Sequence, residues 1–219
     1  MRISILCSNK EHPVYPHLRN WMDRLARAHD IELVEKSSSL SGGDLLFLIS
    51  CNELIGETVR SKYRASLVIH ASDVPKGRGW SPLIWQILEG KNTICVTLLE
   101  ASDRVDSGNI WKQLTVELEG HELYDEINNK LFDVELQLMD FAVKHAGDIY
   151  PLPQQDKEAT FYKKRTPEDS RLDPYKTIAE QFDLLRIADP DRYPAFIDFR
   201  GHRYRIRLFK EDKNRVSLP

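Results

Sequence analysis

Short apolar runs alternate with amphipathic segments along the first 100 residues. Continuous apolar runs are typical of strands that are buried on both faces of a sheet, whereas apolar positions that recur every three or four residues indicate helices. The pattern predicts strands over 3–7, 31–34, 44–50, 66–70 and 93–99, and helices over 18–29, 53–63 and 80–88. Strands that alternate with helices form β-α-β units, so we expect an α/β fold with a Rossmann-like, mostly parallel sheet flanked by helices.

The rest of the chain indicates a long helix and a small C-terminal part. Apolar positions over 123–147 mark one face of an amphipathic helix, which we expect to pack across the sheet. Residues 150–174 are rich in proline and charge and are interpreted as a linker. A helix over 178–187 and a hairpin of 195–199 with 202–209 follow. We therefore divide the chain into a Rossmann-like domain, 1–150, and a linker with a small helix and hairpin subdomain, 151–219.

Charge and cysteine content exclude several classes of protein. The 219 residues contain 31 Lys and Arg against 34 Asp and Glu, a net charge of -3 that argues against a protein that coats nucleic acid. The run 45–49 is far shorter than the roughly 20 apolar residues of a membrane helix, and the apolar N-terminus is too short for a signal peptide. We expect a cytoplasmic protein with no membrane or nucleic-acid partner. The three cysteines and seven histidines show no metal-ligand spacing, so no metal is expected.

The segment 70–82, which follows a predicted buried strand, is the best candidate for a site. Ligands of parallel sheets bind at the carboxyl ends of strands, and no glycine-rich phosphate loop of either common type is present. His70 can polarise a carbonyl or accept a proton, although a histidine at a strand end is otherwise a structural residue. Asp106, in a turn after the last predicted strand, can hydrogen-bond His70 and orient it. The alternative is an Asx-turn carboxylate that bonds its own backbone.

The stretch 67–111 resembles the folate-dependent formyltransferases, which include methionyl-tRNA, glycinamide-ribonucleotide and nucleotide-sugar enzymes. Their shared pattern is an Asn-x-His strand end, a Ser-x-x-Pro-x-x-Arg-Gly loop and an Asp-x-Gly turn about 36 residues beyond the histidine. The matching residues, in order, are His70, Ser72, Pro75, Arg78, Gly79, Asp106 and Gly108. Residues 164–173, the helix that follows them and Tyr193-Pro194 also resemble the segment after the family's catalytic domain.

This resemblance implies transfer of a formyl group from N10-formyltetrahydrofolate, as co-substrate, to a primary amine. His70 would handle the carbonyl and the proton, and Asp106 would orient and charge His70. One position departs from the pattern, because Val68 stands where the family has its asparagine and cannot hydrogen-bond an oxyanion. Asn52, at the end of the neighbouring strand, and Ser72 are the candidate substitutes.

The resemblance also places the two ligands. The pterin of the folate would lie between two strand-end loops, 51–55 and 101–105. Its candidate contacts are Cys51, Asn52, Leu54, Ile55, Ser102, Asp103 and Val105. The candidate contacts of the acceptor are Ser72, Lys76, Arg78, Trp80 and Arg165.

Lys76 and Arg78 can bind anionic groups of the acceptor or of the folate, and Trp80 can stack on a sugar or base. The alternative is a solvated loop with Trp80 as a core residue opposite Trp85. The alternating residues Arg203, Arg205 and Arg207 can hold a diphosphate or form the solvated side of an edge strand.

Among the families that the sequence resembles, nucleotide-sugar N-formyltransferases fit the length and tail best. The expected acceptor is therefore the amino group of a nucleotide-linked amino-deoxy sugar, in surface glycan or nonulosonate synthesis of the pseudaminic-acid type. A methionyl-tRNA or other amine formyltransferase, or a noncatalytic folate-fold binding module, remains the alternative. Apolar stripes on the long helix and hairpin allow a homodimer.

Overall fold

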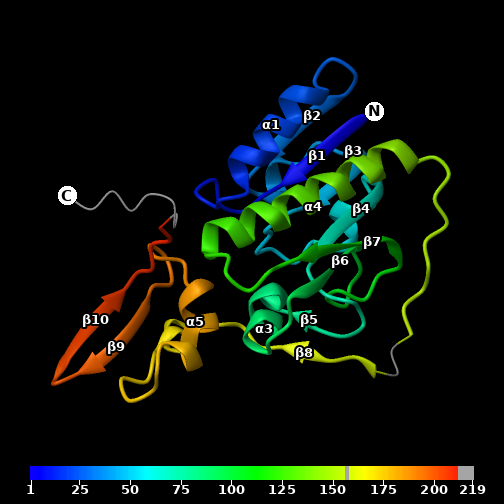
Figure 1. The fold of residues 1–219 in the computed structure, drawn as a ribbon. Helices are drawn as coiled ribbons and strands as arrows, with labels where there is room; N and C mark the ends of the chain where they lie inside the picture. Colours follow the sequence, from blue (N-terminus) through cyan, green and yellow to red (C-terminus); the bar gives the residue numbers. More distant parts are fainter. Residues whose placement is uncertain (156–157, 212–219) are drawn as a thin grey trace.

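A six-stranded sheet forms the centre of the computed structural model, which describes residues 1–155 and 158–211 (Figure 1). Its strand order is β2-β1-β3-β4-β6-β7. The strands are β1 (Arg2–Leu6), β2 (Asp30–Val34), β3 (Gly43–Leu48), β4 (Tyr63–His70), β6 (Thr93–Glu100) and β7 (Ile110–Glu117). The first four are parallel, whereas β6 runs antiparallel to both β4 and β7. The predicted Rossmann-like, mostly parallel sheet is confirmed.

Helices and two small strand pairs surround this sheet. The helices are α1 (Tyr15–Leu25), α2 (Glu57–Arg60), α3 (Pro82–Leu88), α4 (Tyr124–His145) and α5 (Phe182–Arg186), with 3-10 turns at Ser37–Ser39, Pro167–Ser170 and Ala179–Gln181. The short strands β5 (Arg78–Gly79) and β8 (Phe161–Tyr162) pair in parallel, and β9 (Ala195–Phe199) and β10 (His202–Ile206) form the predicted hairpin. This hairpin projects from the rest of the molecule (Figure 1).

The parallel strands have a separate apolar cluster on each face because side chains alternate along a strand. Odd-numbered residues of β1 and β3 pack with α1, α3 and α4 in the larger cluster. There the indole of Trp21 lies against Phe47, and its Nε1 donates to Asp140 at 2.8 Å. Even-numbered residues, such as Leu46 and Leu48, form the smaller cluster together with the segment before α2. Val68 packs against this smaller cluster, so the face that carries Val68 also carries the strand-end loops.

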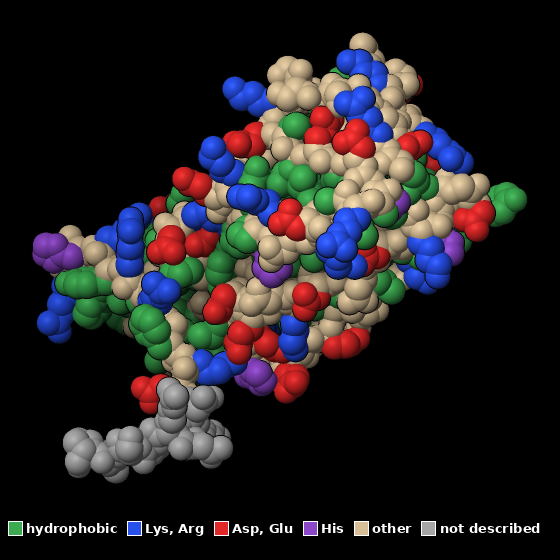
Figure 2. All heavy atoms as spheres, turned by 90° about the horizontal axis from the view of Figure 1, so that it is seen from above, with side chains coloured by type: hydrophobic (Ala, Val, Ile, Leu, Met, Phe, Trp, Pro, Cys, Tyr) green, Lys and Arg blue, Asp and Glu red, His purple; other side chains and the backbone are tan. Residues whose placement is uncertain are grey.

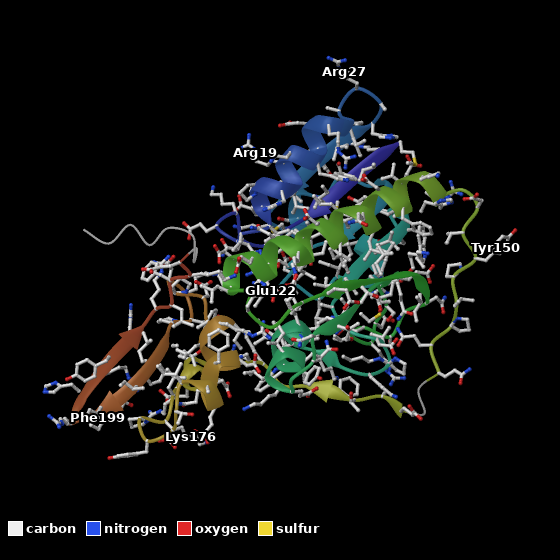
Figure 3. All side chains as sticks on the ribbon, in the orientation of Figure 1. Arg19, Arg27, Glu122, Tyr150, Lys176 and Phe199 are labelled. Atoms are coloured by element: carbon white, nitrogen blue, oxygen red, sulfur yellow. The ribbon has the colours of Figure 1, made fainter. Side chains whose placement is uncertain are left out.

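Buried charge holds α5 against the start of α4. Glu122 precedes α4 (Figure 3). It is buried and accepts a 2.6 Å hydrogen bond from Lys130, and Nη1 of Arg186 in α5 lies 4.0 Å from its Oε2. Burial alone raises the pKa of Glu122, but Lys130 and the backbone N–H groups outweigh it and lower this pKa to about 2. The carboxylate is therefore charged at neutral pH, and it faces the buried guanidinium of Arg186.

Three sequence predictions differ from the structure. The helix expected over 53–63 is reduced to α2, because Gly56 caps its start and Tyr63 already belongs to β4. The helix expected over 178–187 is divided between a 3-10 turn and α5. The predicted linker, 150–174, contains β8 and a capped 3-10 turn. In addition to these three differences, the strand β7 was not predicted. The domain boundary at residue 150 stays a prediction.

The surface carries both signs of charge. Figure 2 shows Lys and Arg side chains mixed with Asp and Glu over the face that it presents, with apolar side chains on the projecting hairpin. None of the helices within 1–155 and 158–211 has both the length and the apolarity to cross a membrane.

Glu135 in α4 generates a stability prediction. Its Oε2 is buried without a hydrogen-bond partner among the described residues, and burial raises the pKa of this carboxyl from 4.5 to about 8. The folded state therefore holds a proton that the unfolded chain releases. The stability that depends on this proton is present below pH 4.5 and is lost as the pH rises to 8.

We expect Glu135→Gln, which cannot ionise, to gain stability over the wild type as the pH rises from 4.5 to 8, by on the order of 4 kcal/mol. Thermal unfolding at both pH values measures the difference, and the exposed neighbour Asp133→Asn is the control. A gain that does not grow with pH would contradict a buried, protonated Glu135.

Candidate functional site

His70 and Asp106 are brought together at the carboxyl end of β4. Nε2 of His70 donates to the carbonyl oxygen of Gly77 at 2.8 Å, which fixes the ring. Nδ1 lies 3.6 Å from Oδ1 of Asp106, an ion-pair distance that is too long for a hydrogen bond. Both side chains are nearly buried, with 8% and 7% of their surfaces exposed. The imidazole of His70 therefore faces the carboxylate of Asp106 in a largely desolvated position, without the hydrogen bond that was expected between them.

The carboxylate of Asp106 also ties two loops together. Its Oδ2 accepts a 2.9 Å hydrogen bond from the backbone N–H of Gly79, so it bonds the loop after β4. Asp106 itself has φ +53, in the left-handed region that non-glycine residues rarely adopt. Gly108, two residues on, allows this turn to approach β6, because a Cβ there would lie 1.9 Å from the carbonyl oxygen of Glu100. The Asp-x-Gly spacing thus has a steric reason.

Gln154, from the predicted linker, supports the same turn. Its Nε2 donates to the carbonyl oxygens of Asp106 at 3.0 Å and Gly108 at 2.7 Å. Its Oε1 accepts a 2.6 Å hydrogen bond from Nη2 of Arg78. Arg78 is 1% exposed, so its guanidinium holds the loop, and direct contact with a ligand stays a prediction. No spacing rule in the sequence points to Gln154, because it follows a run without periodicity.

The strand pair of β5 and β8 completes this anchorage. Oγ1 of Thr160 accepts a 2.8 Å hydrogen bond from the backbone N–H of Gly77. The carbonyl oxygen of Thr160 accepts a second hydrogen bond, of 2.9 Å, from the backbone N–H of Arg78. Gly79 has φ +98, and a Cβ there would lie 2.5 Å from the carbonyl oxygen of Tyr162. Residues 154–162, excluding 156 and 157, therefore hold the loop 77–80 against Asp106.

The two loops expected to hold a pterin lie side by side. Arg60 joins them, because Nη1 donates to the carbonyl oxygen of Ile55 at 2.8 Å and Nη2 donates to Asp103 at 2.7 Å. Leu54 is 86% exposed and Val105 is 48% exposed, so each loop offers an apolar side chain to a ligand. The hydrogen bond to Asp103 raises the pKa of Arg60 despite burial, and the clamp stays charged. Sequence reasoning missed Arg60.

Val68 belongs to the apolar packing beneath these loops. Its side chain packs against the smaller cluster, which also includes Ile55, Cys51 and Ala101. Position 68 therefore provides packing where an amide would provide a hydrogen bond.

Asn52, the first proposed substitute, is exposed, and its backbone N–H donates to Oγ of Ser8 at 2.9 Å. Ser72, the second, is buried, and its Oγ has no hydrogen-bond partner among the described residues. Their catalytic roles stay predictions.

A second polar pair, His12 and Ser50, was not predicted. Nδ1 of His12 accepts from the N–H of Val14 at 3.2 Å, so Nε2 carries the proton and donates to Oγ of Ser50 at 3.0 Å. Burial, with the charge of Arg192, lowers the pKa of His12 to about 4, which keeps the ring neutral at pH 7. Ser50 has φ +47 and follows β3, which lies beside β4. Its own hydroxyl proton is therefore free to be donated to a ligand at the same strand edge.

The remaining candidates for acceptor binding differ in their surroundings. Trp80 is 44% exposed, so its interpretation as a core residue is wrong. Lys76 pairs with Glu158 at 2.7 Å, and the guanidinium of Arg165 lies 5.9 Å from the ring centre of Trp85. Arg203 pairs with Asp198 at 2.8 Å, as a charged side chain of the exposed hairpin. Throughout the described part of the chain, no group of His, Cys, Asp and Glu residues has an arrangement that could hold a metal ion.

Residues 7–143 match the model of a protein family described as formyl transferase. The fold is similar to methionyl-tRNA formyltransferase from Clostridium thermocellum, with a TM-score of 0.82 and 18% identity over 98% of this chain and 95% of that chain. It is also similar to a sugar N-formyltransferase from a Shewanella species, with a TM-score of 0.72 and 16% identity over 96% of this chain and 98% of that chain. A third similar structure is HypX from Aquifex aeolicus in complex with tetrahydrofolic acid, with a TM-score of 0.76 and 24% identity. This match covers 95% of this chain and 37% of that chain.

The contacts of Gln154 generate a prediction about this site. We expect Gln154→Ala to lower the free energy of unfolding by about 1–3 kcal/mol, because the carbonyls of Asp106 and Gly108 and the Arg78 guanidinium lose their partner. Urea unfolding measures the loss. The exposed neighbour Gln155→Ala is the matched control and is expected to stay within about 0.5 kcal/mol of the wild type. Equal stability of the two variants would mean that Gln154 does not support the turn.

Proposed function

Because the chain belongs to the formyl transferase family, we propose that it transfers a formyl group from N10-formyltetrahydrofolate to the amino group of a nucleotide-linked amino-deoxy sugar. The observation that carries this proposal is the nearly buried His70–Asp106 pair at the carboxyl end of β4. The family match supports formyl transfer as the reaction. The folate donor and the sugar acceptor are the finer parts of the proposal.

The reaction needs one proton to move from the amine to the leaving group. The amine nitrogen attacks the formyl carbon, a tetrahedral oxyanion forms, and the bond between that carbon and N10 breaks. The amine loses a proton and N10 gains one, so no further reactant is required. His70 can carry this proton, because Asp106 lies 3.6 Å from Nδ1 and stabilises the charge that the ring acquires. Gly77 keeps the ring in place through Nε2.

The oxyanion needs a hydrogen-bond donor, and Val68 cannot supply one. The edge after β3 offers two groups that can. Asn52 is an exposed amide, and Ser50 has a hydroxyl whose oxygen already accepts from His12 and whose proton is free to be donated. One such donor is typically worth about 10²–10³ in rate, so this edge matters to turnover as much as the histidine does. Ser72 is less suited, because its side chain is buried.

The loops 51–55 and 101–105 suit a pterin. A flat heterocycle needs apolar contact on its faces and hydrogen bonds at its edges. Leu54 and Val105 supply exposed apolar side chains, and Arg60 keeps the two loops together. One of the solved structures with the same fold is a complex with tetrahydrofolic acid, which further supports a folate donor for this chain.

The acceptor is proposed from two observations. Sugar N-formyltransferases are among the structures of similar fold, although the methionyl-tRNA formyltransferase matches over as much of both chains. The net charge of -3 and the mixed charges on the face in Figure 2 do not favour a tRNA acceptor, since RNA binding depends on many phosphate contacts. We place the reaction in the synthesis of surface glycans or nonulosonates, with a pseudaminic-type precursor as the first substrate to test.

The catalytic pair can be tested directly. We expect His70→Ala and Asp106→Asn each to lower turnover at least about tenfold while the protein stays folded, because each change disables the proton carrier. Mass spectrometry of amino-sugar nucleotides incubated with the donor measures turnover, and circular dichroism checks the fold. His202→Ala, at the tip of the hairpin, is the control for loss of an exposed imidazole. Wild-type rates in both variants would exclude this mechanism.

The folate loops can be tested by ligand binding alone. We expect Arg60→Ala to reduce the rise in melting temperature that 5-formyltetrahydrofolate, a nonreactive folate, produces in the wild type, because the loops lose their clamp. Arg64→Ala removes an exposed arginine of β4 and is the matched control. If both variants respond as the wild type does, the folate does not depend on these loops.

A further inference from the structure

An exposed tryptophan, Trp80, ends the loop 77–80 that is held against Asp106. Trp80 follows Gly79, whose N–H donates to Asp106, and its own N–H donates to the carbonyl oxygen of Tyr162 at 3.2 Å. Its backbone lies between two residues in the left-handed region, Gly79 with φ +98 and Ser81 with φ +50. The fold therefore fixes the backbone of Trp80 while 44% of the residue stays exposed. An indole presented in this way can stack on a planar ligand.

A cation lies over this indole. Nζ of Lys164 is 4.6 Å from the ring centre of Trp80. Within residues 1–155 and 158–211, Lys164 has no carboxylate at ion-pair distance, whereas Lys163 pairs with Asp169 at 2.9 Å. The charge of Lys164 is therefore not neutralised by an acidic neighbour. An aromatic face beside an unneutralised ammonium is suited to a ring that carries phosphates.

The segment that carries Lys164 is itself fixed in place. Trp85 of α3 donates from Nε1 to the carbonyl oxygen of Lys163 at 2.9 Å, and its ring stacks on Tyr162 at 6.3 Å. Trp85 therefore holds the end of β8 against α3, which lies beside β5 in Figure 1. The two tryptophans have different roles, because Trp85 supports the segment and Trp80 is the one left exposed.

The distance between Trp80 and the catalytic pair suits one nucleotide sugar. The N–H of Gly79 is 2.9 Å from the Asp106 carboxylate, and neighbouring Cα atoms are about 3.8 Å apart, so the whole indole lies within about 15 Å of that carboxylate. A diphosphate and a sugar ring can span this gap. A base on Trp80 would therefore leave a sugar amine within reach of His70.

We propose that Trp80 and Lys164 form the nucleotide subsite of the acceptor: the base stacks on the exposed indole of Trp80, and the diphosphate lies beside the ammonium of Lys164. This inference rests on the proposed function, since it assigns a surface to the nucleotide part of the same substrate. One aromatic platform and one unneutralised lysine accommodate one nucleotide, which favours a nucleoside diphosphate over a polynucleotide.

Titration calorimetry with uridine and thymidine diphosphates tests the subsite without the reaction. We expect Trp80→Ala to weaken nucleotide binding about tenfold or more, because the stacking of one base on an aromatic ring is lost. Trp80→Phe, which keeps an aromatic ring, is expected to retain most of the wild-type affinity. Lys164→Ala is expected to weaken binding several-fold and to reduce its salt dependence, because one phosphate contact is lost. Lys176→Ala, on an exposed turn that Figure 3 shows away from the sheet, is the control.

The kinetic readout separates the two proposals. With an amino-sugar nucleotide as acceptor, Trp80→Ala and Lys164→Ala should raise KM more than they lower kcat, because they act on binding. Wild-type affinity and wild-type KM in both variants would overturn the subsite, while continued formylation would leave the proposed function intact. Formylation of a free amino sugar, without nucleotide binding, would also overturn the subsite. Absence of formylation on every acceptor would instead count against the proposed function.

Discussion

The hydrogen bond from the N–H of Gly79 to the Asp106 carboxylate is the contact on which the rest of the site depends. It joins the loop after β4 to the turn after β6, and these two segments carry the histidine and the carboxylate of the proposed reaction. Each side of the bond is held separately, by β8 against Gly79 and by Gln154 against the backbone of Asp106. A histidine at a strand end therefore lies within 4 Å of a carboxylate that comes 36 residues later.

The surfaces that we assign to the two ligands of the proposed reaction lie near this contact. On one side, the smaller apolar cluster and the Arg60 clamp shape the loops that we assign to the folate. On the other side, the backbone that continues from Gly79 presents Trp80 with Lys164 over its ring. The donor and the acceptor of the proposed reaction would approach His70 from these two sides, and the exposed hydroxyl of Ser50 lies just after β3, the strand beside β4.

Local patterns in the sequence predicted the sheet, and the resemblance to a known family pointed to His70 and Asp106, but neither predicted the contacts that hold them. Buried parallel strands are continuous apolar runs, and their order along the chain predicts the fold. Gln154 and Arg60 were missed because a side chain that bonds distant backbone leaves no periodic signal. The helix expected over 53–63 was wrong because Gly56 and the early start of β4 restrict it to α2. The antiparallel β7 was missed because half of its residues are polar and exposed.

The most direct test of this account is mass spectrometry of a panel of UDP- and dTDP-linked amino sugars incubated with the protein and N10-formyltetrahydrofolate. The account predicts that at least one sugar gains a single formyl group and that an equal amount of tetrahydrofolate appears. Methionyl-tRNA, in a parallel reaction, is expected to stay unmodified. Binding of folate without formylation of any amine in the panel would contradict the account and would favour a noncatalytic folate-binding module.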